Sequence, residues 1–291
     1  MGKQIIGVRQ DGLGGRLISF ILTLNLSKKL SCKYGYIWRE NKACENIFSD
    51  LFSLPRDCEI AIYGKFNELK SVAKKNIGYL GQKRNFICES IDSLRISMRL
   101  DAEDKNSEIE EIKERDKLEI LETCEVVVVK PYLETEFTAE QLDPGYFNKI
   151  VKPQDEIMQM KDNFLNCIGR DNLAGVHVRR GDIIPKKRYD KFVSLKTHIN
   201  QMNNHLRENP RNRFFISTDS PEIIGELKEA FPDKIVYFAK DDHTRGAAGI
   251  KAALIDLLIL SECSIIQGGT SQFCRAASIL GGKKLEQVQD T

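Results

Sequence analysis

The sequence lacks any strong excess of charge of one sign. Its 44 lysine and arginine residues nearly balance 42 aspartate and glutamate residues, which leaves a net charge of +2 over 291 residues. Proteins that bind nucleic acid or membrane surfaces through general electrostatics usually carry a marked basic excess. We therefore expect no nucleic-acid partner, and any basic site has to be a local one.

The sequence also lacks a hydrophobic run long enough to span a bilayer. The best segment, residues 17–26, is interrupted by Ser19, Thr23 and Asn25 and is too short for a transmembrane helix. It has neither the basic region nor the small-residue cleavage site of a signal peptide. These features predict a cytoplasmic protein of bacterial type, without an integral membrane segment or a Golgi-type anchor.

Metal-binding and hydrolase motifs are missing as well. The eight cysteines are scattered singly, and none forms a CxxC motif or a Cys/His pair at zinc spacing. There is no HExxH, no GxSxG and no well-placed Asp-x-Asp pair. The nearest metal candidate is Asp241-Asp242-His243, for which a solvated loop is the simpler interpretation. We expect reduced, mostly buried thiols and no metal.

What is present in the first half is the start of an α/β fold. A short apolar strand at residues 5–8, a glycine-rich turn at 12–15 and a buried helix at 16–30 form its first unit. Further strands are predicted at residues 34–38 and 126–129. The charge-dense segment 90–122 is typical of solvated helices. It could equally be a dimerisation hairpin, so a homodimer stays open.

The second half alternates regularly between strand and helix patterns. Four strands alternating with helices predict a parallel, doubly wound sheet. Breaks at residues 143–145 and at Pro153 place a domain boundary there, with domains at 1–152 and 153–291. The strands are expected at residues 174–178, 213–218, 234–239 and 264–267, and the helices at 154–167, 193–207, 219–231, 247–263 and 269–280, with Pro221 at the first helical position of 219–231.

Polar side chains follow several of these strands. Ligands of an open parallel sheet bind at the carboxyl ends of its strands, and paired arginines with a helix N-terminus suit a diphosphate. An ion-paired surface cluster and simple helix capping are the structural alternatives. His177 lies two residues before Arg179 and should project to the same face. The candidates are Arg179, Arg180 and Asp182 after the first strand, Thr218 and Asp219 after the second, and Gly269, Thr270 and Ser271 after the last.

The loop "DGLGGR" in the first half is a second, weaker candidate. A strand followed by glycines and a helix N-terminus forms a generic anion cradle, here from Gly12, Gly14, Gly15 and Arg16. A tight turn that lets the helix pack explains the glycines equally well. The loop lacks the GK[ST] of a Walker A motif and the third glycine of GxGxxG. A phosphoryl-transfer enzyme therefore ranks last among the hypotheses.

Three ordered motifs resemble the fucosyltransferase superfamily, which includes α1,6-, nodulation, α1,2- and protein O-fucosyltransferases. "HVRRGD" at 177–182 resembles its HxRRxD signature, "FISTDSPEII" resembles the segment between motifs, and "LIDLLILSECSIIQGGTSQFCRAASIL" is very similar to its last motif. "DGLGGRL" and "CENIFSDLF" match more weakly. Gly181 and Gly15 depart from the pattern of the α1,6 branch and of the family's N-terminal loop, respectively.

The resemblance implies a GT-B fold, with two Rossmann-like domains facing across a cleft, the first on the acceptor side and the second binding the donor. It also implies inverting, metal-independent transfer of fucose from GDP-fucose to a carbohydrate acceptor. By motif position Arg179 would hold the β-phosphate, with Arg180 in support, and Ser271 would bind the diphosphate. His177 and Asp256 would recognise guanine. Guanine would then be the partner that Asp256, an acid inside an apolar helix, requires.

Several points stay open at this stage. Asp182 and Asp11 are candidates for the general base, and an acceptor-activated mechanism without a strong base is an alternative. Another sugar nucleotide of the GDP-mannose type could replace GDP-fucose. A catalytically inactive module that binds GDP-sugars belongs to a different class of function. No motif identifies the acceptor.

Overall fold

The computed structural model describes residues 4–9, 11–56, 59–64, 77–81, 86–88, 126–130, 142–180 and 193–290. The chain divides into two compact units, residues 1–43 with 54–151 and residues 44–53 with 152–291. The sequence predicts residues 44–53 in the first domain, whereas their contacts lie with the second unit. The charged segment 90–122 lies outside the described residues.

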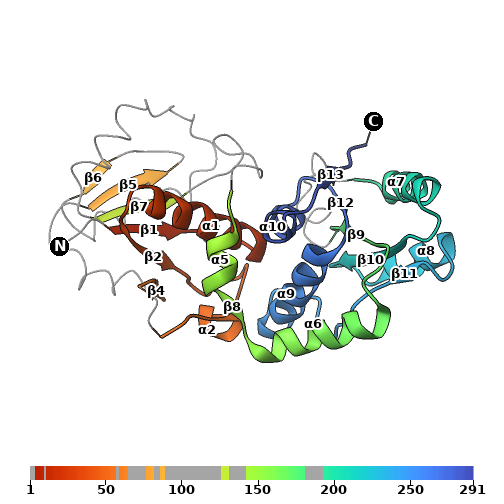
Figure 1. Ribbon diagram of the computed structural model, residues 1–291, viewed down its shortest axis with the longest axis horizontal. Coiled ribbons are helices and arrows are strands. Elements are labelled where there is room, and N and C mark those ends of the chain that lie inside the picture. Colours follow the sequence, from red (N-terminus) through yellow and green to blue (C-terminus); the bar gives the residue numbers. More distant parts are fainter. Residues whose placement is uncertain are drawn as a thin grey trace. The chain divides into compact units, whose positions relative to one another are not determined.

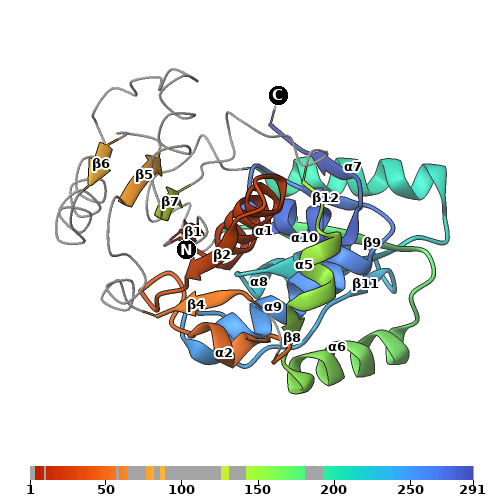
Figure 2. The same ribbon diagram turned by 60° about the vertical axis from the view of Figure 1, so that its left-hand side comes forward.

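The first unit contains a six-stranded sheet in the order β4-β2-β1-β7-β5-β6, which can be followed across Figure 2. β1 pairs in parallel with both β2 and β7, so it lies inside the sheet. The edge strand β6 runs antiparallel to β5. The strands are β1 (Gln4–Val8), β2 (Lys33–Ile37), β4 (Ala61–Tyr63), β5 (Ile77–Gly81), β6 (Phe86–Cys88) and β7 (Val126–Lys130).

The helix after β1 begins earlier than the sequence predicts. α1 spans Leu13–Lys29, so Gly14 and Gly15 belong to its first turn and not to a preceding loop. A Cβ on Gly15 would lie 2.7 Å from the carboxylate oxygens of Asp11. Glycine therefore lets Asp11 fold back over the first turn of the helix. α1 and the short helix α5 (Gly145–Ile150) enclose the aromatic core of this unit, where Phe20 contacts Phe147.

The second unit contains a five-stranded, entirely parallel sheet in the order β11-β10-β9-β12-β13 (Figure 1). Numbered along this unit the order is 3-2-1-4-5, the start of the Rossmann order. The predicted third strand at 234–239 is reduced to two half-buried edge residues, and β13 is an addition. The strands are β9 (Leu173–Val178), β10 (Arg213–Thr218), β11 (Ile235–Val236), β12 (Ile266–Gly268) and β13 (Leu285–Gln287).

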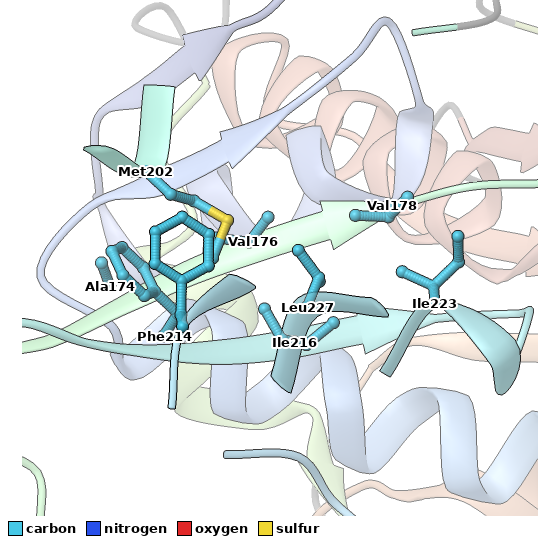
Figure 3. Packing of buried hydrophobic residues seen from close by; sticks show 9 residues of the cluster. Ala174, Val176, Val178, Met202, Phe214, Ile216, Ile223 and Leu227 are labelled. Atoms are coloured by element: carbon cyan, nitrogen blue, oxygen red, sulfur yellow. The ribbon is translucent and has the colours of Figure 1, made fainter. Parts of the chain in front are cut away.

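Helices cover both faces of this sheet. One face packs on α7 (Leu195–Glu208) and α8 (Glu222–Ala230) through the apolar cluster of Figure 3, which joins Val176 and Ile216 to Met202 and Leu227. The other face packs on α9 (Ala247–Glu262), which contacts α6 (Asp155–Ile168) and α10 (Gln272–Gly281). β9 is buried along its whole length, as expected for a parallel strand covered on both faces. α8 begins one residue after Pro221.

Residues 44–53 join the second unit through a short helix and strand. α2 (Phe48–Leu51) buries Phe48 and Leu51, and β3 (Phe52–Ser53) pairs antiparallel with β8 (Lys152–Pro153). The side-chain nitrogen Nε2 of Gln154 donates a hydrogen bond to the carbonyl of Ser49 at 2.6 Å. These contacts join residues that are far apart in the sequence. A single boundary drawn at one point of the sequence therefore could not predict that residues 44–53 belong to the second unit. Within the part of the chain that the structure describes, no helix has the length and apolar character needed to cross a membrane.

Candidate functional site

The candidate site lies where the strand order of the second sheet reverses. β9 has β10 on one side and β12 on the other, and ligands of this topology bind at such a switch point. The carboxyl ends of these strands bring together most of the predicted residues of this unit. Arg179 and Arg180 follow β9, Thr218 and Asp219 lie at the end of β10, and Gly269, Thr270 and Ser271 follow β12.

His177 is the central buried polar residue of this edge. Its Nε2 lies 3.3 Å from Ser271 Oγ, and its ring stacks on Phe273 with centroids 4.9 Å apart. Burial lowers the pKa of His177 to about 3, with Asp219 opposing and Arg179 reinforcing the shift. The imidazole is therefore neutral at physiological pH. Its Nδ1 is buried and has no hydrogen-bond partner within the described part of the chain.

Ser271 links this histidine to a helix N-terminus. It is the N-cap of α10, and its Oγ accepts a hydrogen bond from the Phe273 amide at 3.2 Å. Because a serine hydroxyl can accept and donate at once, its proton remains available to His177 Nε2 or to a ligand. Donation to Nε2 would leave the imidazole proton on Nδ1, the buried atom without a partner.

The two arginines differ in their surroundings. Arg180 is buried, its NH1 donates to the Val193 carbonyl at 2.6 Å, and its backbone amide donates to Asp219 Oδ1 at 2.7 Å. The residues on either side of segment 181–192, Arg180 and Val193, are thus joined by a hydrogen bond. Arg179 is half-buried, and its charge acts on both His177 and Cys274, so its guanidinium lies beside the edge. Asp182 lies outside the described residues.

Asp256 reaches the same face of the sheet from α9. Its Oδ2 accepts hydrogen bonds from Ser217 Oγ at 2.9 Å and from Lys240 Nζ at 2.7 Å. Ser217 is the register partner of His177 on the neighbouring strand, and paired residues of adjacent strands project to the same side about 5 Å apart. Asp256 Oδ1 is buried without a hydrogen-bond partner. His177 Nδ1 and Asp256 Oδ1, both buried and without a hydrogen-bond partner among the described residues, therefore belong to side chains on the same face of two neighbouring strands.

Ser217, Lys240 and Phe273 contribute to this site but were not predicted to do so. Lys240 directly follows the predicted strand 234–239, so the rule that selected Arg179 after its strand would also have selected it. Ser217 is a polar residue that directly follows the apolar run 214–216 of β10. Phe273 carries no such signal, because an aromatic residue in the first turn of a helix is ordinarily part of the core.

The predicted residues of the first unit have structural roles within that unit. Gly12 is the N-cap of α1, and a Cβ there would meet nothing within 4 Å. Arg16 is completely buried, and its Nε and NH1 donate to the carbonyls of Asp11 at 2.8 Å and Arg39 at 2.6 Å. Arg16 is therefore a brace inside this unit. Asp11 accepts from Arg9 Nε with both oxygens, at 2.8 and 2.7 Å.

The metal candidate at 241–243 has a structural explanation. Asp242 accepts from the amides of Thr244 at 2.7 Å and Gly249 at 3.1 Å, so it caps the first turn of α9. These hydrogen bonds, led by those with Thr244, lower the pKa of Asp242. Among the described residues, no group of three or more His, Cys, Asp or Glu side chains could hold a metal ion.

Comparison with solved structures shows which known proteins have a similar fold. A NodZ α-1,6-fucosyltransferase soaked with GDP-fucose matches with a TM-score of 0.64 and 17% identity, over 96% of this chain and 93% of that one. The fucosyltransferase NodZ from Bradyrhizobium matches at 0.63 and 18%, over 96% and 94%. POFUT1 in complex with GDP matches at 0.59 and 13%, over 97% and 96%. No protein-family model and no curated protein matches the sequence.

These similarities extend over nearly the whole chain and over both units. The chain has the α/β, GT-B type fold of these fucosyltransferases, and the predicted fold class is confirmed. At these identities the likeness concerns the fold, so the function is argued from the site.

Proposed function

We propose that this protein is a glycosyltransferase that moves fucose from GDP-fucose to a glycan acceptor, with inversion and without a metal. The observation that carries the proposal is that two buried atoms at the switch point of the second sheet, Asp256 Oδ1 and His177 Nδ1, have no hydrogen-bond partner among the residues that the structure describes. Buried polar atoms normally have partners. A ligand at this edge would supply them.

Guanine has the complementary groups. Its N1–H and exocyclic amine are adjacent donors, which suit the free oxygen of an ionised Asp256, and its other edge carries acceptors for an Nδ1–H of His177. In support, the structures of similar fold include one soaked with GDP-fucose and others in complex with GDP. Together these observations favour a GDP-sugar over other nucleotide sugars.

The remaining predicted residues suit the diphosphate. Ser271 and the N-terminus of α10, with Gly269 and Thr270 before it, form a place for an anion. The charge of Arg179 acts on His177 and Cys274, and its guanidinium would bind the β-phosphate as a planar fork. Arg180 would act indirectly by bracing the ends of segment 181–192.

The transfer itself would be a single displacement. An acceptor hydroxyl attacks C1 of fucose, the bond from C1 to the β-phosphate oxygen breaks, and the electron pair stays on GDP. Negative charge grows on that phosphate oxygen, so Arg179 stabilises the transition state more than the ground state. The acceptor proton leaves to Asp182, to Asp11 or directly to solvent. Asp11 would have to release its ion pair with Arg9 to serve as the base.

A donor panel tests this function directly. We expect the protein to bind GDP-fucose, to hydrolyse it slowly without an acceptor, and to transfer fucose to a glycan on an array. Preferential turnover of GDP-mannose would change the assigned donor, and the protein would still be a glycosyltransferase. Tight GDP-fucose binding with neither hydrolysis nor transfer would favour an inactive binding module instead, and absence of any GDP binding would refute the proposal.

A further inference from the structure

The buried carboxylate of Asp256 depends on a lysine from another part of the chain. The side chain of Asp256 is 2% exposed and that of Lys240 is 10% exposed, and their charged atoms lie 2.7 Å apart. Lys240 Nζ also donates to the Thr218 carbonyl, at 2.9 Å. Lys240 therefore ties the segment after β11 to the carboxyl end of β10 and to α9.

Two donors bind the same oxygen of Asp256 and leave the other without a partner. Ser217 and Lys240 both donate to Oδ2, while Oδ1 has no hydrogen-bond partner. Such an arrangement fixes the rotation of the carboxylate and keeps one oxygen for a ligand. Lys240 belongs to none of the motifs that the sequence shares with fucosyltransferases.

The charge of Lys240 also opposes the effect of burial on the Asp256 carboxyl. Burial raises the pKa of this carboxyl, and Lys240 is the strongest opposing influence, followed by Ser217 and His243. Lys240 and His243 come from the segment between β11 and α9, and Ser217 from β10. A buried carboxyl without a cationic partner becomes neutral in the physiological range. Removal of Lys240 would therefore raise the pKa of Asp256 further and favour its neutral form.

We propose that Lys240 is a positioning residue for the nucleotide base, which holds Asp256 ionised and oriented so that Oδ1 accepts hydrogen bonds from guanine; this inference rests on the proposed function. A protonated Asp256 would place an O–H donor against the donors of guanine. The ionised form accepts from both. Lys240 thus sets the preference for guanine without touching the nucleotide.

The test measures nucleotide affinity against pH by calorimetry, with GDP, IDP and ADP as probes between pH 6 and pH 8. We expect wild-type GDP affinity to be nearly constant over this range. In Lys240→Met, GDP affinity should fall by about 10- to 100-fold at pH 6, because hydrogen bonds to a charged group are lost. It should recover as the pH rises through the raised pKa of Asp256. IDP, which lacks the exocyclic amine, should lose less affinity.

Three variants separate a charge effect from a packing effect. Lys240→Arg keeps the charge and should restore flat, near-normal GDP binding. Ser217→Ala removes a neutral donor from the same oxygen and should weaken GDP binding without adding a pH slope. Lys251→Met removes a surface lysine of α9, whose Nζ lies 3.5 Å from Glu156, and should behave as wild type.

The outcomes are distinguishable. If wild type binds no guanine nucleotide, the proposed function and this inference both fail. If wild type binds GDP but Lys240→Met binds it equally well, or weakens GDP and ADP equally at every pH, only the inference is overturned. Should Lys240→Met not fold, Lys240→Gln replaces it, with circular dichroism as the check. A pH-dependent loss restricted to guanine nucleotides supports the inference.

Discussion

Two histidines of the second unit are buried in their neutral form. His177 lies at the candidate site, and Nδ1 of His198 on α7 accepts a hydrogen bond from Gln267 Nε2 at 3.0 Å. Burial lowers the pKa of His198 to about 4, with the Arg180 charge acting in the same direction. In the unfolded chain each histidine would titrate near 6.5. Protons bound only by the unfolded state destabilise the fold.

This difference between the pKa of His198 in the folded and in the unfolded chain predicts that acid lowers the stability of the fold. As the pH falls from 6.5 toward 4, the unfolded chain protonates His198 while the folded protein does not, so stability is lost on acidification. From pH 7 to pH 5 the loss from His198 is about 2 kcal/mol by linkage. His198→Asn should lose correspondingly less stability between these pH values in urea unfolding. The surface variant Lys251→Met should keep the full wild-type difference, and an unchanged difference in His198→Asn would contradict the assignment.

Arg179 is the residue on which the proposed chemistry depends most. Arg179→Ala should lower turnover of GDP-fucose by about 100- to 1,000-fold, the usual cost of one transition-state donor. Arg179→Lys should fail nearly as badly, because the planar fork is lost. Both should keep the wild-type circular dichroism spectrum. The exposed Arg211, in the turn before β10, offers a matched control, and Arg211→Ala should retain full activity.

At the scale of elements, two glycines allow close backbone contacts around α9. A Cβ on Gly281, the last residue of α10, would lie 2.0 Å from the Ser261 carbonyl oxygen of α9. On Gly249, in the first turn of α9, it would lie 2.2 Å from the Thr244 carbonyl oxygen. Backbone atoms cannot move aside as flexible side chains do. Gly281 therefore lets α10 pack closely on α9, and Gly249 lets the segment before α9 fold back onto its first turn.

A pair of glycine variants tests this packing. Gly281→Ala should destabilise the protein by several kcal/mol, since the clash forces α9 and α10 apart. Gly225→Ala is the matched control, because Gly225 lies inside α8 and an added Cβ there meets nothing within 4 Å. It should stabilise the protein by about 0.5–1 kcal/mol through helix propensity. Thermal unfolding measures both. Equal effects would refute the packing argument.

At the scale of the whole molecule, the chain is nearly neutral, and the cations that matter for the proposal are local to the second sheet. Arg179, Arg180 and Lys240 all follow the carboxyl ends of strands in the second unit. The proposed donor would bring the negative charge of a diphosphate to this edge. Arginines and a helix N-terminus can neutralise such charge in place of a divalent cation.

This distribution leads to a prediction about metals. Transfer of fucose should continue undiminished in excess EDTA, and added Mg²⁺ or Mn²⁺ should not raise the rate of the dialysed protein. Initial rates with GDP-fucose measure both, and a known metal-dependent glycosyltransferase in the same buffer confirms that chelation is complete. Strict dependence on either cation would rule out charge neutralisation by arginine alone.

Much of the second sheet could be predicted because its signals are local. The strand 213–218 coincides with β10, and the predicted helices at 154–167 and 247–263 match α6 and α9 to within a residue at each end. The short edge strands β11 and β13 were predicted poorly, since pairing with a neighbour and not their own pattern makes them strands. The early start of α1 was missed because the glycines of "DGLGGR" favour a turn as readily as a helix start.

The candidate site was predictable where it follows a motif or a strand end, as with His177, Arg179 and Ser271. The partners of Asp256 were not predicted, because Ser217 and Lys240 are 39 and 16 residues away in sequence. Arg16 was predicted as a ligand from its place after a glycine loop, but nothing local reveals that its guanidinium is buried against Asp11 and Arg39. Its role as a ligand stays a prediction that this burial does not favour.

The sequence by itself determined the alternation of strands and helices and the residues at the strand ends, since periodicity and turn chemistry act over a few residues. Only the tertiary structure decided that residues 44–53 join the second unit, that Arg16 is a brace, and that a lysine holds Asp256. These depend on contacts between segments far apart in the chain. The free energy of burying a charge or a polar group is set by whatever the fold places beside it.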